Sequence, residues 1–231
     1  MRKSIFVLLV ATCMAVSLPM TAAALGLDVE AKVGAGLALG STNNPDLSGT
    51  PQVAAGGGLG VDFYFVNAGP VDMGIAAGIE YSYLATHSVW KNYGMPANDM
   101  TEDAYYNYLI FPVSLVGKVP LAQSVELVIH AGGFLGAFIG GTYKATFSNP
   151  FFPAYPGTSG NLDSSNTIGL VGGLHFAAGT DIALGGNFSL SPALQFDMGL
   201  SDIDANNTAN GTFTNTLWSL TVMVGIKYKV L

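Results

Sequence analysis

The sequence predicts an all-β fold, a transmembrane, antiparallel, up-and-down β-barrel of eight strands. Half of the 231 residues are hydrophobic and only 10% are charged, whereas soluble domains carry about 25% charged residues. No run of about 20 apolar residues is present, so membrane-spanning helices are not expected. Instead, apolar and polar residues alternate over many segments, as they do in strands that turn one face to lipid and the other to a lumen.

The first 24 residues have the pattern of a secretory signal peptide. A basic start is followed by an apolar stretch at 5–18 and by a small-residue cleavage site at 22–24. We expect cleavage after Ala24, with Ala23 as the alternative. The expected organisation is therefore a signal peptide at 1–24 and one barrel domain at 25–231.

Cleavage there would also change the composition of the mature chain. It would remove the single cysteine, Cys13, and the single arginine, Arg2, and the net charge would go from −7 to −9 because Lys3 leaves as well. A chain without thiols suits an oxidising compartment, and its acidity argues against nucleic acid as a partner. The alternatives are a retained membrane helix and a lipoprotein signal ending at Cys13, and the apolar stretch is short for both.

Eight segments alternate with the period of two that is typical of strands. They lie at about 27–40, 52–66, 71–86, 105–119, 125–147, 167–182, 188–201 and 218–230. Tight turns at 67–70, 120–124 and 184–187 separate them from longer polar loops at 41–51, 87–103, 148–166 and 203–213. This asymmetry predicts a bacterial outer-membrane location, with both termini in the periplasm and the long loops outside the cell. A soluble barrel also alternates, but its polar rows would hold more Lys and Glu.

The fourth segment carries a motif in which Tyr108, Pro112 and Lys118 are spaced as Tyr-x-x-x-Pro-x-x-x-x-x-Lys. It resembles a strand of the bacterial outer membrane protein β-barrel families, the OmpX, OmpW and PorT-like small barrels. The resemblance implies a protein that is embedded in outer-membrane lipid and holds no cofactor.

The C-terminus resembles the assembly signal of the same families. Gly225, Tyr228 and Val230 stand at the matching positions, whereas Met223 and Leu231 depart from the pattern. The resemblance implies that the β-barrel assembly machinery is a partner of the chain.

Charged and polar side chains recur on the rows expected to face the lumen. Lys118 and Glu126 flank a turn and are expected to form an ion pair, because charges in a narrow lumen need partners. A second contact is expected where the first strand meets the last. The full set is Glu30, Lys32, Asp62, Glu80, Lys118, Glu126, His130, His175, Asp197, Lys227 and Lys229.

In the seam between those two strands, Glu30 and Lys32 are expected to meet Lys227 and Lys229. We interpret the whole polar set as a structural plug, with a selectivity gate or proton-linked site as the alternative. The fifth segment should also direct Lys144 into the lumen.

His130 and His175 could suggest chemistry, but the pattern is incomplete. A metal would need a third ligand from Asp197 or Glu80, and no nucleophile motif accompanies the histidines. We therefore predict no metal site, no catalytic residue and no enzymatic activity.

Glycines repeat on the inner rows at 34, 36, 56, 58, 60, 74, 78, 132, 136 and 140. They either relieve crowding in tightly coiled strands or leave spare apolar volume, as the OmpW-like resemblance would imply. The second interpretation favours a narrow channel or carrier for small, hydrophobic solutes. The alternative is an adhesin-like or structural barrel acting through its loops, where Trp90, Tyr93, Met95, Phe151, Phe152 and Tyr155 would meet a host surface ligand.

Overall fold

The computed structural model describes residues 26–42, 47–91, 98–148, 157–163, 167–203 and 215–231. The expected signal peptide lies outside these ranges, as do the loop aromatic residues Tyr93, Met95, Phe151, Phe152 and Tyr155. No helix long and apolar enough to cross a membrane occurs among the described residues. The strands are β1 (Gly26–Thr42), β2 (Leu47–Thr50), β3 (Gln52–Ala68), β4 (Val71–Trp90), β5 (Asp99–Ala122), β6 (Val125–Ser148), β7 (Thr158–Leu162), β8 (Leu170–Gly185), β9 (Phe188–Gly199) and β10 (Asn215–Lys229).

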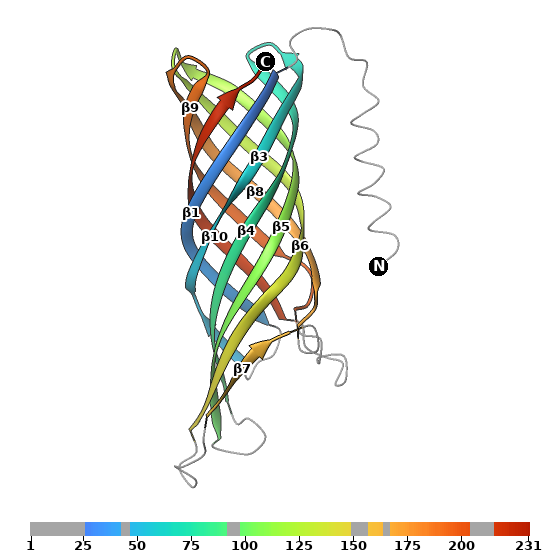
Figure 1. Cartoon of the computed structure of the whole chain (residues 1–231), viewed down its shortest axis with the longest axis vertical. Helices are drawn as coiled ribbons and strands as arrows, with labels where there is room; N and C mark the ends of the chain where they lie inside the picture. The colour runs from blue at the N-terminus through green and yellow to red at the C-terminus, as the bar shows by residue number, and fades with distance from the viewer. Residues whose placement is uncertain (1–25, 43–46, 92–97, 149–156, 164–166, 204–214) are drawn as a thin grey trace.

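Eight of these strands close a ring in the order β1, β3, β4, β5, β6, β8, β9 and β10, and β10 pairs back onto β1. Every pairing is antiparallel. Figure 1 shows the strands winding at an angle to the long axis, as closure of a barrel requires. The prediction of an eight-stranded, up-and-down barrel is confirmed.

The three predicted tight turns all lie at one end, called here the turn end. Each joins two strands through two residues, at 69–70, 123–124 and 186–187. Gly69 and Gly186 have φ values of 71° and 58°, a backbone region that favours glycine and suits a tight hairpin. The opposite end, where the longer connections gather, is called the loop end.

The barrel turns its apolar residues outward and its charges inward. Val33 and Leu115 are 67% and 58% exposed, whereas Asp62 and Lys227 are 5% and 4% exposed. A soluble barrel would show the reverse. Aromatic pairs such as Phe188 with Tyr228 mark the outer wall near the turn end, and pairs such as Phe196 with Trp218 mark it near the loop end. An apolar band between aromatic girdles is the surface of a transmembrane barrel.

Three neighbouring strands are longer than a membrane requires. β4 has 20 residues and β5 and β6 have 24 each, whereas about 9–11 suffice to cross. The predicted loop 87–103 is therefore partly strand, because β4 and β5 continue pairing through it, and 148–166 is partly strand because it contains β7, which pairs with β6. β2 joins the free side of β4 and β7 joins β6, so a five-stranded extension projects at the loop end (Figure 1).

A β-bulge in β6 reverses which side chains face inward. Asn107 pairs with Gly140 but Tyr108 pairs with Phe138, so Ile139 is an extra residue. Gly140 has a φ of 144°, which a residue with a side chain rarely adopts. The expected inward position of Lys144 is wrong for this reason: Lys144 is exposed on the outside.

Most inner-row glycines sit where strands approach closely. A Cβ on Gly56 would lie 2.6 Å from the Tyr81 carbonyl oxygen, and one on Gly58 would lie 2.7 Å from the Glu80 Cα. Gly60 and Gly140 lack such close neighbours. At the inner-row glycines where an added Cβ would clash, the close approach of neighbouring strands explains the glycine, and spare lumen volume does not.

Candidate functional site

The lumen near the turn end holds a cluster of charges contributed by strands from opposite walls. Lys118 Nζ lies 2.5 Å from Asp28 Oδ2 and 3.6 Å from Asp181 Oδ2. Lys227 Nζ lies 3.0 Å from Asp62 Oδ2 and 3.1 Å from Asp181 Oδ2. We call these five residues the turn-end cluster, in which two buried lysines are shared among three buried carboxylates.

Surrounding groups hold the turn-end cluster in place. Tyr64 places its ring 4.6 Å from Lys118 Nζ and points its hydroxyl at Asp62, and the Ser191 hydroxyl donates to Asp181 Oδ1 at 2.5 Å. Glu126 Oε2 lies 3.5 Å from Lys118 Nζ, so the two residues expected to pair across the turn do meet. Asp28 is the nearer partner, and the Glu126 side chain is 43% exposed to solvent.

The contacts expected across the closing seam are wrong in part. Glu30 and Lys227 are backbone partners in the β1–β10 ladder. The Lys227 side chain nevertheless reaches over the lumen to Asp62 and Asp181, and the Glu30 carboxylate lies against Gly225, which has no side chain to block it. Lys229 is exposed at the turn end. Lys32 turns away from the seam altogether.

A second polar group, the central cluster, lies around Lys32. Its ammonium is 2.8 Å from Glu80 Oε1 and 3.0 Å from Gln195 Oε1. The Gln195 amide donates to Glu80 at 3.0 Å and to Asp197 at 2.8 Å. Asp197 in turn lies 2.6 Å from His175 Nδ1. These contacts link β1, β4, β8 and β9 across the lumen, and all the buried polar groups in the chain of contacts have partners.

His130 is the remaining residue of the expected polar set. Its Nδ1 lies 3.5 Å from the Ser114 hydroxyl, at the limit of a hydrogen bond. Among the described residues, no group of three His, Cys, Asp or Glu side chains is arranged to hold a metal ion.

An apolar layer separates the central cluster from the loop end. Tyr108 and Phe134 are its largest buried members, with Phe138 packed edge-on to Tyr108 at 5.5 Å between ring centroids. The others are Ala38, Ala54, Leu84, Ile110, Val171 and Leu217. Tyr108 and Lys118 of the sequence motif both point inward from β5. Tyr108 belongs to the apolar layer and Lys118 to the turn-end cluster.

The cavities within these layers are small. Pockets of about 40, 30 and 30 Å³ lie beside the central cluster and the apolar layer, enough for single water molecules. Side chains fill the described part of the lumen from the turn end to the apolar layer, as expected for an eight-stranded barrel.

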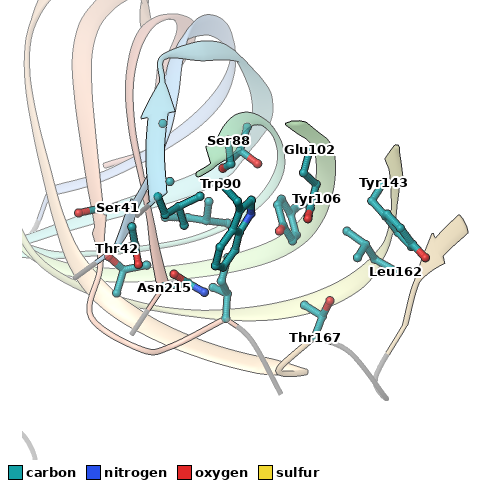
Figure 2. A pocket seen from close by; sticks show the side chains of 17 residues that line it. Ser41, Thr42, Ser88, Trp90, Glu102, Tyr106, Tyr143, Leu162, Thr167 and Asn215 are labelled. Atoms are coloured by element: carbon teal, nitrogen blue, oxygen red, sulfur yellow. The ribbon is translucent and has the colours of Figure 1, made fainter. Parts of the chain in front are cut away.

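Beyond the apolar layer the barrel opens into a cavity of about 410 Å³ at the loop end, called the mouth pocket. Figure 2 shows Ser41, Thr42 and Asn215 on one side of it, Trp90 in the middle and Tyr106 beside Glu102. Sequence reasoning missed this pocket because 87–103 was expected to be loop. The pattern that could have revealed it is the alternation of Thr86, Ser88 and Trp90, which continues the inward row of β4.

The expected assembly-signal residues lie at the turn end. Tyr228 is on the outer wall, with its ring centroid 4.9 Å from that of Phe188. Val230 follows the end of β10, and its N–H donates to the Leu27 carbonyl at 2.7 Å. Their role in assembly stays a prediction.

Comparison with known proteins finds matches among solved structures. No family model matches the chain, and no curated protein sequence does. The chain is similar to Neisserial surface protein A (TM-score 0.40, 13% identity, 87% of this chain and 96% of that one). It is similar to OprG from Pseudomonas aeruginosa (TM-score 0.40, 13% identity, 88% of this chain and 95% of that one). It is also similar to Ail of Yersinia pestis (TM-score 0.34, 15% identity, 87% of this chain and 97% of that one). A closed ring of eight antiparallel strands, charged inside and apolar outside, makes this chain a small transmembrane β-barrel.

Proposed function

We propose that this chain is a non-enzymatic surface-binding barrel whose lumen is closed and whose loop end, facing out of the cell, binds a ligand. The single observation that supports this most is the contrast between the two ends of the lumen. The turn end and centre are filled by ion pairs and an apolar layer, whereas the loop end carries a cavity of about 410 Å³.

The five-stranded extension also favours a surface role. β4, β5 and β6 continue well past the length that a membrane crossing needs, and they carry β2 and β7 on their sides. Strand pairing at the loop end holds binding groups on a rigid support, which lowers the ordering cost of binding.

A channel or carrier for small hydrophobic solutes is the competing function. Such a solute would have to pass Tyr108 and Phe134 of the apolar layer. It would then have to cross the central cluster and the turn-end cluster, whose charged groups are in direct contact with one another. Moving buried ion pairs apart is costly, because each charge would lose its partner in a confined space.

Retention of cells on a surface tests the proposal. Bacteria displaying the full barrel should be retained on immobilised host-cell membranes more than cells displaying a variant whose β4–β5 hairpin is shortened between His87 and Asp103. A barrel with Val113→Ala on the lipid-facing wall is the matched control and should behave like the unchanged protein. Equal retention of the full and shortened barrels, with both folded as judged by heat-modifiable gel migration, would contradict the proposal.

A further inference from the structure

The mouth pocket has a chemical character that indicates its ligand class. Its lining includes the hydroxyl groups of Ser41, Thr42, Thr86 and Ser88 and the amide of Asn215. Three aromatic and four aliphatic side chains complete it, those of Trp90, Tyr106, Tyr143, Leu47, Leu162, Ile203 and Leu217. Among the described lining residues, Glu102 supplies the one carboxylate and none is a lysine or an arginine.

From this lining we infer that the mouth pocket binds a neutral carbohydrate unit, an inference that rests on the proposed surface-binding function. A sugar ring presents C–H groups on its faces and hydroxyl groups on its rim. It therefore requires an apolar aromatic surface together with many short polar groups that both donate and accept hydrogen bonds. The mouth pocket offers this combination in a volume typical of small-molecule sites.

The charge of the pocket excludes other ligands. Phosphate, sulfate and carboxylate groups are recognised by arginine, lysine or several converging N–H donors. No described residue of the lining has a cationic side chain. Sulfated and sialylated sugars should therefore bind worse than their neutral counterparts.

Most of the lining residues stand on strands, with Thr167 and Ile203 as the exceptions. Thr86, Ser88 and Trp90 belong to one inward row of β4, whose partners in β5 are Ala104, Glu102 and Met100. Asn215 donates its backbone N–H to Asp202 at 3.1 Å, and its carbonyl accepts from Ile203 at 2.9 Å. The site is thus formed before the ligand arrives, which reduces the entropy lost on binding.

A quaternary ammonium group is the competing ligand, because Trp90 and Glu102 could attract a cation. Such a site needs several rings facing a single point. Tyr106 instead stacks on Tyr108 with 22° between the ring planes. Tyr143 packs toward β7, where a Cβ on Gly160 would be 3.0 Å from its ring. The arrangement is an open, hydroxyl-rich pocket rather than an aromatic cage.

Intrinsic fluorescence provides a direct test, because the chain has two tryptophans and only Trp90 lines the pocket. The Trp218→Phe variant of the mature barrel leaves Trp90 as the sole reporter. It should be placed in nanodiscs of phosphatidylethanolamine and phosphatidylglycerol, since maltoside and phosphocholine detergents would compete. The probes are glucose, galactose, N-acetylglucosamine and lactose as neutral sugars, with sialic acid, glucose 6-phosphate and choline for comparison.

At least one neutral sugar should shift Trp90 emission saturably, with sialic acid and glucose 6-phosphate at least tenfold weaker. Thr86→Val with Ser88→Ala should weaken the sugar about tenfold, as expected for lost hydrogen bonds. The control Val113→Ala on the outer wall should not. Saturation-transfer NMR on the unchanged barrel gives a second readout that needs no pocket variant.

Binding of choline alone, or of no neutral sugar, would overturn the inference. Sugar binding that survives the pocket substitutions in a folded barrel would overturn it too. These failures differ from failure of the proposed function. That failure would appear as equal retention of cells displaying the full barrel and cells displaying the barrel with the shortened β4–β5 hairpin.

Discussion

Lys118 Nζ and Asp28 Oδ2 are 2.5 Å apart although they stand on β5 and β1, which are not neighbours in the ring. β3 and β4 separate these strands on one side, and β6, β8, β9 and β10 separate them on the other. The ion pair therefore crosses the lumen. Together with the contacts of Lys227 and Lys32, it ties opposite walls of the barrel through the interior.

Removing the Lys118 ammonium should strongly destabilise the barrel. Lys118→Met leaves Asp28 buried without its nearest cation, and breaking a buried pair costs about 3–5 kcal/mol. Equilibrium unfolding in urea, followed by tryptophan fluorescence of the lipid-embedded protein, measures this loss. Lys91→Met is the control, because Lys91 pairs with Asp99 while 60% exposed and should cost no more than about 1 kcal/mol. Equal effects of the two substitutions would refute the structural role of the turn-end cluster.

The apolar layer should respond differently to changes at its two large rings. Phe134→Ala removes a buried ring and should cost about 3–5 kcal/mol of the free energy of unfolding. The Tyr108 hydroxyl is buried with no hydrogen-bond partner among the described residues. Tyr108→Phe should therefore be neutral or stabilise the barrel by up to about 1 kcal/mol. A large loss with Tyr108→Phe in the same urea unfolding experiment would contradict a Tyr108 hydroxyl without a hydrogen-bond partner.

The bulge at Gly140 can be tested by cysteine labelling, since the predicted mature chain has no cysteine. Lys144→Cys should react with a water-soluble maleimide in intact proteoliposomes, and Ala145→Cys should react slowly because Ala145 is 4% exposed. Without the bulge the two rates would be reversed. Gly140→Val should also cost about 1–3 kcal/mol in unfolding, because valine disfavours a φ of 144°. Gly117→Ala, with open space for its Cβ, is the control.

The sequence predicts the barrel well because period-two alternation is a local signal. Each of the eight predicted segments corresponds to a ring strand, and glycine, proline and asparagine mark the two-residue turns at 69–70 and 186–187. Lys118 and Glu126 could be paired because a short hairpin fixes their separation. Alternation fails at Ile139 and Gly140, where one inserted residue exchanges the two faces and no neighbouring residue marks the change.

Contacts across the lumen could not be predicted from alternation. Which residue of β1 lies opposite Lys118 depends on strand tilt and on the stagger accumulated around the ring. The expected polar set therefore lacks Asp28 and Asp181, and it pairs Lys227 with its neighbour Glu30 instead of Asp62. The mouth pocket was missed for a related reason, because polar residues such as Ser88 and Glu102 are typical of loops until strand pairing is known.

Single-channel recording tests the central claim, that the lumen is closed, most directly. The mature barrel in planar lipid bilayers should give no stable conductance steps, because the ion clusters and the apolar layer occupy the lumen. A barrel carrying Lys118→Ala, Lys227→Ala and Phe134→Ala should conduct if it still folds, and Val113→Ala should remain silent. Stable steps in the unchanged protein, with an amplitude that these lumen substitutions do not alter, would contradict the account.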